Sequence, residues 1–222
     1  MAILAQSVAP GGFDRRTTIR LAAGAAGLLV VLIVLTAAVW HDTGPTLLDH
    51  TPAAVQNRLN RLAPPLVFRR MVWLASPGMV VALAVALALL AARWRDWFGA
   101  ALACVGPAIA VVLVEKVAKP LVGRHTTTDA NNVFPSGHVT GAAAIAAVAV
   151  LLIYRRRGAT SARRWALAAG CLPFAVTLGV VHLGWHFLTD AVGGLAFGTA
   201  TVLATAAALS VLWPRVVAGD RR

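Results

Sequence analysis

The sequence is poor in charged residues. Only 13% of its 222 residues are charged, whereas 59% are hydrophobic. A soluble domain of this length needs more polar surface than these residues provide, so the composition excludes an ordinary soluble protein. We therefore expect a protein embedded in a membrane.

Acidic residues are the scarcest charged type. There are 8 Asp and Glu against 20 Lys and Arg, which gives a formal net charge of +12. On a soluble protein this excess would indicate nucleic acid as a partner. Here most basic residues lie between apolar runs, so we expect them to contact membrane lipids and expect no nucleic-acid partner.

Cysteine is nearly absent. The two cysteines, Cys104 and Cys171, lie within apolar runs, and we expect small core residues there and no disulfide. We also expect no cleaved secretory signal, because the first apolar run has about 20 residues and no small-residue cleavage pattern with a polar exit follows it. We interpret that run as a membrane span.

Six uncharged runs have about the length that a helix needs to cross a bilayer, which is about 20 residues. They predict an all-α, polytopic protein with six transmembrane helices. Residues 1–222 then form a single membrane domain with cytoplasmic tails at about 1–18 and 214–222. The runs are Leu21–Trp40, Met71–Ala92, Trp97–Val114, Val139–Tyr154, Trp165–Trp185 and Ala191–Trp213.

The distribution of basic residues predicts the orientation. Thirteen arginines fall on the side of the two termini, and seven basic residues fall on the other side. Cytoplasmic loops carry the excess of Lys and Arg. We therefore expect a protein of the inner (plasma) membrane with both termini in the cytoplasm, and an extracytoplasmic position for the polar segments around residues 136 and 186.

Residues 51–62 have the pattern of a short amphipathic helix in the first outer loop. Thr51 followed by Pro52 is a favourable helix start. Val55, Leu59 and Leu62 follow at helical spacing, with polar residues between them. This pattern predicts a helix lying on the outer leaflet, and a packed connector is an equally good interpretation.

Polar residues that interrupt the apolar pattern form three clusters on the outer side. Ionisable residues in or beside membrane spans are functional candidates by default. The clusters are Lys116, Lys119 and Arg124; then Ser136, Gly137 and His138; and then His182, His186 and Asp190.

The segment PSGH, residues 135–138, opens the fourth run. Ser136 fits an ordinary helix N-cap. In a functional interpretation, the free N–H groups of the helix N-terminus and the absence of a side chain on Gly137 form a cradle for an anion. His138, in the first turn, can give a proton to whatever is bound there.

The segment HLGWHFLTD, residues 182–190, places His182, His186 and Asp190 four residues apart. On a helix they would share one face. Asp190 can then fix the tautomer of His186 and leave its other ring nitrogen as a nucleophile or base. A zinc site and a satisfied polar pair at the end of a span fit the spacing equally well.

The basic cluster favours a phosphate site. A transferring phosphoryl group needs positive charge that a zinc hydrolase does not specifically need. Arg124 can fork onto two phosphate oxygens, and Lys119, with Lys116 as an alternative, can act as a point charge. The competing interpretation is that these residues contact lipid head groups.

Together, the three clusters resemble the type 2 phosphatidic acid phosphatase (PAP2) family of membrane-embedded, metal-independent lipid phosphatases. That family has a lysine–arginine motif, then PSGH, then an arginine followed by a histidine and, four residues later, an aspartate. The resemblance covers roughly residues 70–213.

The resemblance implies a two-step hydrolysis through a phosphohistidine, without a metal or another cofactor. It assigns His186 as the nucleophile, Asp190 as the residue that orients it, and His138 as the general acid. The phosphate-binding positions that it implies are Ser136, Gly137, Lys119 and Arg124, with Lys116 and His182 as further candidates.

The sequence departs from the family pattern at two positions. Thr126 stands seven residues after Lys119, where the family has an arginine, and the nearest arginine is Arg124. Val180 stands six residues before His186, where the family has another arginine. Loss of one charged contact to the transition state costs about 2–4 kcal/mol, or about 30- to 1000-fold in rate.

We therefore predict an integral-membrane enzyme that hydrolyses a lipid phosphate or diphosphate, with polyprenyl diphosphate as the preferred substrate. Phosphatidylglycerol phosphate, phosphatidic acid and a prenyl-phosphate sugar are the alternative substrates. A lipid-binding protein without activity, and a zinc hydrolase that uses the third cluster, are the alternative classes.

Overall fold

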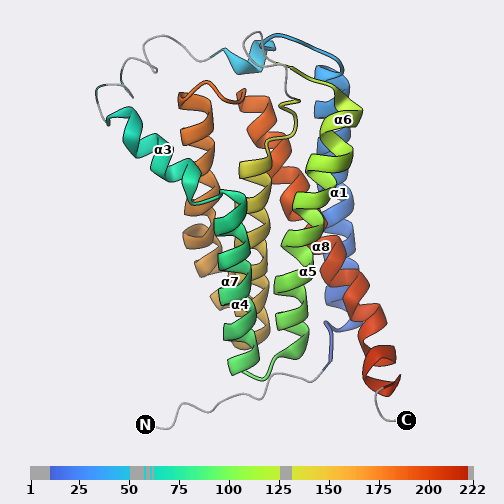
Figure 1. The fold of residues 1–222 in the computed structure, drawn as a ribbon. Coiled ribbons are helices and arrows are strands. Elements are labelled where there is room, and N and C mark those ends of the chain that lie inside the picture. Colours follow the sequence, from blue (N-terminus) through green and yellow to red (C-terminus); the bar gives the residue numbers. More distant parts are fainter. Residues whose placement is uncertain (1–10, 51–57, 59–60, 62, 126–131, 220–222) are drawn as a thin grey trace.

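The structure, a computed structural model, describes residues 11–50, 58, 61, 63–125 and 132–219. Within these ranges every element is helical, which confirms the all-α fold class (Figure 1). The amphipathic helix expected at 51–62 falls almost wholly outside them. The elements are α1 (Arg15–Val39), η1 (Leu47–Asp49), α3 (Pro65–Trp73), α4 (Pro77–Arg93), α5 (Trp97–Leu113), η2 (Val114–Ala118), α6 (Lys119–Val122), α7 (Gly137–His182) and α8 (Leu188–Gly219).

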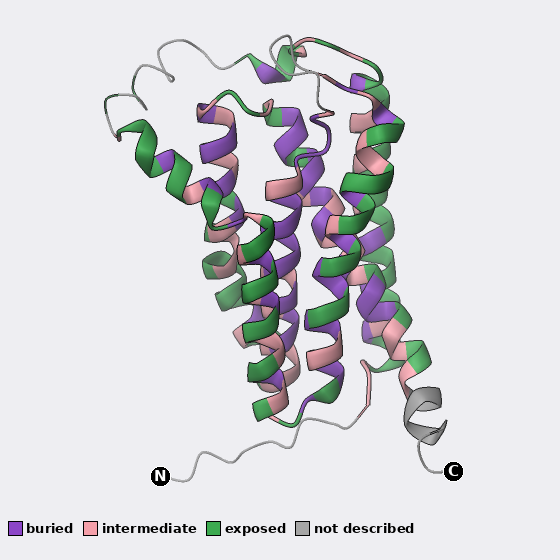
Figure 2. Ribbon diagram, in the orientation of Figure 1, coloured by how far each residue is buried: buried purple, intermediate pink, exposed green. Residues whose placement is uncertain are grey.

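The bundle has the exterior of a multi-pass membrane protein. Four helical stretches are long and apolar enough to cross a membrane, namely α1, 97–122, α7 and α8 as far as residue 213, and α3 with α4 would add a fifth. Val34 on α1 and Leu89 on α4 are 63% and 66% exposed, and Figure 2 shows exposed residues along the outward faces. An apolar exterior suits lipid and not water.

Cys104 and Cys171 are free thiols on this exterior, so their expected core position is wrong.

The expected run Met71–Ala92 is not one continuous helix. α3 and α4 meet at a bend of 50°, and Pro77 is the first residue of α4. Proline lacks an N–H and disfavours a helical conformation in the preceding residue. Ser76 accordingly has an extended backbone, with ψ of 153°, and α3 tilts away from the axis of α4 (Figure 1).

The 46-residue α7 consists of two arms that pack side by side. Gly158 interrupts it with φ of 78° and ψ of 179°, a conformation that favours glycine. Val139 and Val180 belong to one core cluster, although a straight helix would place them about 60 Å apart. The arms coincide with the fourth and fifth apolar runs, and the count of six membrane spans stays a prediction.

α8 packs closely against the start of α7. A Cβ on Gly194 would lie 2.7 Å from the carbonyl oxygen of Ser136, and a Cβ on Gly198 would overlap the carbonyl oxygen of Thr140. Only glycine permits so close an approach of two backbones. The small residues of α8 thereby bring the PSGH segment beside the beginning of α8.

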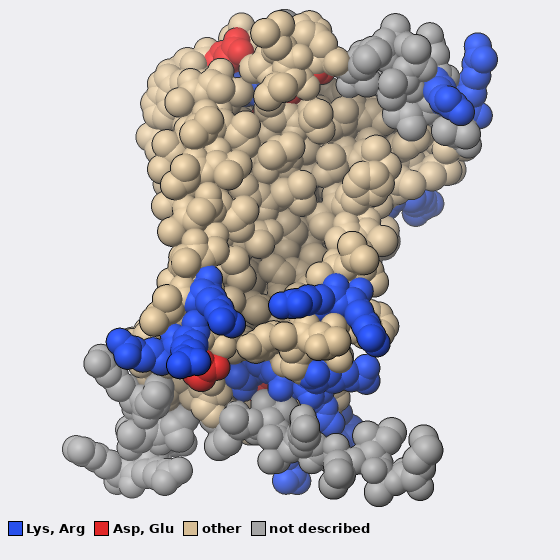
Figure 3. Space-filling view, turned by 180° about the vertical axis from the view of Figure 1, so that it is seen from behind, with Lys and Arg blue, Asp and Glu red and all other residues tan. Residues whose placement is uncertain are grey.

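Basic side chains gather at the end of the bundle where α1 begins (Figure 3). Inside this end, Asp96 caps α5 through the N–H of Gly99, and it accepts hydrogen bonds of 2.7 and 2.8 Å from Arg155. Both side chains are almost fully buried. The charge distribution agrees with the expected cytoplasmic end, whose assignment stays a prediction. The exposed arginines here include Arg15, Arg16, Arg20, Arg93, Arg157, Arg163 and Arg164.

Candidate active site

Segments from four parts of the chain meet at the opposite end of the bundle (Figure 1). They are the residues after α1, those after α6, those before α7 and the turn between α7 and α8. The N–H of Val133 donates to the carbonyl of Arg124 at 2.8 Å, and the N–H of Ser136 donates to the carbonyl of Asp190 at 3.0 Å. These backbone bonds connect the three polar clusters.

Ser136 is the N-cap residue of α7, but its side chain does not cap the helix. Its backbone carbonyl accepts from the N–H of Thr140 at 2.9 Å, whereas the hydroxyl makes no capping bond. The Oγ is buried and has no hydrogen-bond partner among the described residues. A buried polar group without a partner costs about 1–3 kcal/mol, so capping does not explain why a serine stands here.

A carboxylate lies over Gly137, the first residue of α7. A Cβ on Gly137 would overlap Oε1 of Glu115 and would lie 3.5 Å from Nζ of Lys119. Lys119 donates to both oxygens of Glu115, at 2.7 and 2.9 Å. A negative group therefore occupies the N-terminus of a long helix, where the helix dipole favours an anion. The sequence interpretation missed Glu115, although an acidic residue four before a lysine in an apolar run was a usable signal.

The wide turn η2 precedes Lys119. The N–H of Lys119 donates to the carbonyl of Val114, five residues earlier, and Pro120, which follows, has no N–H to continue the regular pattern. Such π-turns are frequent at functional sites. Among the described residues, Lys119 and not Lys116 lies against Gly137, and Lys116 is exposed.

His138, the second residue of α7, lies near His186. Its ring centroid lies 6.2 Å from that of Trp185. His186, Lys119 and Glu115 are close enough to act on its charge. The expected acid and the expected nucleophile are thus neighbours, beside the carboxylate of Glu115.

His186 and Asp190 are brought together, but not on one helical face. α7 ends at His182, Gly184 has a φ of 70°, and α8 begins at Leu188, so the expected helical stripe is wrong. Nδ1 of His186 lies 3.7 Å from Oδ2 of Asp190. The same carboxylate oxygen accepts from the N–H of Phe187 at 2.8 Å, as in a helix cap.

His182 points elsewhere. Its ring stacks on Phe68 of α3, with centroids 3.9 Å apart, and it is 8% exposed. The zinc hypothesis needed His182, His186 and Asp190 around one ion. In the described part of the chain, these residues do not form a group that could hold a metal.

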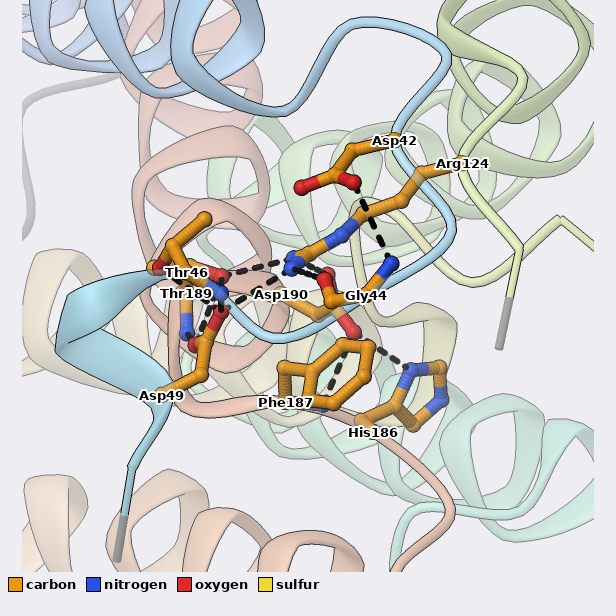
Figure 4. Close-up of polar contacts among 9 residues, drawn as sticks. All are labelled: Asp42, Gly44, Thr46, Asp49, Arg124, His186, Phe187, Thr189 and Asp190. Atoms are coloured by element: carbon orange, nitrogen blue, oxygen red, sulfur yellow. Dashed lines mark hydrogen bonds and ion pairs between the residues drawn. The ribbon is translucent and has the colours of Figure 1, made fainter. Parts of the chain in front are cut away.

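Arg124 is fully buried and is held by two carboxylates (Figure 4). Nη1 donates to Asp190 at 2.5 Å and to Thr189 at 2.7 Å. Nη2 donates to Asp49 and to the carbonyl of Gly44, each at 2.9 Å. The expected bidentate hydrogen bonding of Arg124 to a phosphate would require these contacts to break. The guanidinium instead supports Asp190, the residue expected to orient His186.

Asp49, on η1, was not a sequence candidate. Burial alone would raise the pKa of its carboxyl. Hydrogen bonds from the N–H of Thr189, from Arg124 and from Thr46 outweigh burial and lower the pKa from 3.8 to about 2. Asp49 is therefore ionised at neutral pH. The local pattern of Thr46 and Asp49 marks only a capping box, and the partners Arg124 and Thr189 lie 75 and 140 residues away.

Apolar packing fills the position where the family pattern has its third-motif arginine. Val180 is fully buried in a core cluster with Val72 and Val139. A Cβ on the preceding Gly179 would lie 2.7 Å from a methyl group of Val72. α3 thus packs against the backbone at the position where the family pattern has the arginine. Thr126, the other departure from the pattern, lies outside the described residues.

Comparison with known proteins gives two findings. Residues 115–214 match the PAP2 superfamily. The structure is similar to the crystal structure of a transmembrane PAP2-type phosphatidylglycerolphosphate phosphatase from Bacillus subtilis, with a TM-score of 0.61 and 21% identity over 83% of this chain and 94% of that one. No curated protein matches the sequence.

Proposed function

The chain belongs to the PAP2 superfamily over residues 115–214, and from this membership we infer that it is a phosphoric ester hydrolase that acts on a lipid phosphate. The fold supports the inference, because a PAP2-type lipid phosphatase has a similar structure. The multi-pass helical architecture also supports the inference, because the polar end of such a bundle would lie at the level of the lipid head groups.

The observation that carries this proposal is the hydroxyl of Ser136, which is buried at the N-terminus of α7 without a partner among the described residues. A phosphoryl oxygen held there would accept from this hydroxyl and from the unsatisfied N–H groups of the first turn. Lys119 supplies a positive charge beside Gly137. Together, these groups supply the hydrogen-bond donors and the positive charge that a bound phosphate requires.

The reaction that we propose has two displacements at phosphorus. Nε2 of His186 attacks, an N–P bond forms, and the bond from phosphorus to the leaving oxygen breaks. His138, as an imidazolium, gives its proton to that oxygen. Water then attacks phosphorus, an O–P bond forms as the N–P bond breaks, and His138 takes a proton from the water, so that inorganic phosphate and neutral His186 result. Asp190 lies on the Nδ1 side of His186, which leaves Nε2 for the attack.

Glu115 has to give up its place when substrate binds. Its carboxylate now occupies the space over Gly137 and the hydrogen bonds of Lys119. A phosphate carries more charge and more acceptor oxygens than a carboxylate, so it competes well for the lysine. Because Glu115 is part of an exposed ion pair, separating the pair costs only about 0–1 kcal/mol.

For the substrate, we propose polyprenyl diphosphate at the extracytoplasmic face, with both termini in the cytoplasm. The basic residues at the opposite end support this orientation. A groove of about 530 Å³ between α1 and the α5–α6 stretch supports a substrate with a long apolar tail, since it is lined by apolar residues such as Leu32, Trp40, Val117 and Leu121. Phosphatidylglycerol phosphate is the main alternative, because the similar structure is a phosphatase of that lipid.

Phosphate release by the purified full chain tests the proposal. Polyprenyl diphosphate, phosphatidylglycerol phosphate and phosphatidic acid are compared in detergent after exhaustive chelation. We expect release that vanadate inhibits and that His186→Ala abolishes. Lipid binding without release from any of the three would instead establish a binding protein, an outcome that the engaged Arg124 and the apolar Val180 would explain.

A further inference from the structure

We propose that Asp49 is a positioning residue for catalysis, which acts on His186 through Arg124 and Asp190. The proposal rests on the function inferred above. It goes beyond the family match, since Asp49 lies 66 residues before the matched region begins. The first outer loop then contributes a part of the catalytic apparatus.

The contacts of Asp49 are those of a fixed, buried anion. Its side chain is fully buried. Oδ1 accepts from the N–H and the hydroxyl of Thr189, each at 2.8 Å, and Oδ2 accepts from Arg124 at 2.9 Å and from the N–H of Thr46 at 2.9 Å. Loop, arginine and the start of α8 are therefore held by one carboxylate (Figure 4).

Asp49 determines how Arg124 meets Asp190. The two ends of the guanidinium are divided, with Nη1 on Asp190 and Nη2 on Asp49. Without a carboxylate at Nη2, an arginine and one aspartate favour a bidentate ion pair, in which two N–H groups donate to the two carboxylate oxygens. Such a pair would turn Asp190 toward the arginine and away from Nδ1 of His186, which now lies 3.7 Å from its other oxygen.

Asp49 also sets the charge next to His186. Two buried carboxylates face one guanidinium, so the group of Asp49, Arg124 and Asp190 carries one net negative charge. That charge stabilises a positive charge on the imidazole as phosphorus is attacked. If Asp49 were neutral, Arg124 would cancel the charge of Asp190. Other ionisable groups near His186 include Glu115, Lys119 and His138.

The first experiment compares Asp49→Asn with Asp42→Asn. Asp42 lies in the same loop. Among the described contacts, its side chain accepts one hydrogen bond, of 3.2 Å, from the N–H of Gly44. The amide oxygen of an asparagine can also accept this bond. We expect Asp49→Asn to lower kcat about tenfold to a hundredfold. KM and inhibition by inorganic phosphate stay within about twofold, because the groups that Asp49 contacts are Thr46, Arg124 and Thr189, and not the proposed phosphate ligands Ser136 and Lys119. Asp42→Asn leaves all three unchanged.

A double-mutant cycle with Arg124→Gln tests the path of the effect. If Asp49 acts through Arg124, then Asp49→Asn lowers kcat by less than about twofold in the Arg124→Gln background. Effects that multiply in the double variant would overturn the proposal, as would an unchanged kcat in Asp49→Asn. If that variant does not fold, Asp49→Ser replaces it with the same expectations, because serine keeps an oxygen acceptor and removes the charge.

A measurement without turnover separates this proposal from the proposed function. The chain has six histidines, so ¹⁵N-histidine NMR can follow the ring nitrogens of His186, assigned by loss of its signals in His186→Ala. We expect Asp49→Asn to shift these signals and Asp42→Asn to leave them in place. Unchanged signals would refute the positioning role even if no lipid phosphate were hydrolysed, and shifted signals would support it in the same case.

Discussion

The carboxylate of Glu115 lies against Gly137 at the N-terminus of α7, in the space that any other residue at position 137 would fill with its Cβ. Both oxygens of Glu115 accept from Lys119. An acidic side chain therefore occupies the place in which we propose that the substrate phosphate binds.

Glu115→Gln should bind phosphate more tightly. The amide competes less well for Lys119, so inorganic phosphate should inhibit the variant at about two- to fivefold lower concentration, in line with the strength of an exposed ion pair. The measurement is the inhibition constant at constant pH. Weaker inhibition than in the wild type would show that Glu115 assists binding instead of competing with it.

Lys119→Gln and Lys116→Gln should differ strongly. Lys119 lies beside Gly137, and loss of a hydrogen bond to a charged group costs about 1.5–3 kcal/mol, or about 10- to 150-fold in KM or in inhibition by phosphate. Lys116 is exposed and serves as the matched control. Equal losses in both variants would mean that the two lysines act only through general attraction of the anionic lipid.

Ser136→Ala should lower activity without lowering stability. The hydroxyl makes no hydrogen bond with the described residues, so its removal leaves no protein group unsatisfied. We expect kcat/KM to fall about tenfold or more and Tm to stay the same or rise. Thr201→Val is the control, since the Thr201 hydroxyl bonds within α8. A clear drop in Tm for Ser136→Ala would restore the capping interpretation.

Acid should weaken the fold through Asp49. Its pKa is 3.8 when unperturbed and about 2 in the folded protein. A depressed pKa contributes stability above the unfolded value, and this contribution, about 2 kcal/mol, is lost as the pH falls from about 4 to about 2. The difference in Tm between the wild type and Asp49→Asn should therefore shrink over that interval. A constant difference from pH 6 to about pH 2 would contradict the assignment.

The catalytic candidates could be found from the sequence because each belongs to a short motif. Ser136, Gly137 and His138 are adjacent, and His186 and Asp190 are four residues apart. His186 and Asp190 are close in space although the expected helix is absent, since the turn at Gly184 still brings His186 to Asp190. Glu115 could have been found in this way, because it stands four residues before Lys119, which it contacts. Asp49 could not, because its partners Arg124 and Thr189 lie 75 and 140 residues away.

Hydropathy and spacing along the chain were enough for the membrane class, the all-α fold and the family, because these properties depend on residues close in sequence. The contact partners of a long polar side chain could not be predicted in this way. Arg124 was expected to reach phosphate, and in the folded chain it pairs with Asp49 and Asp190, which lie far apart in the sequence. A buried guanidinium requires countercharges, and which carboxylates supply them depends on how the outer loop and α8 pack together.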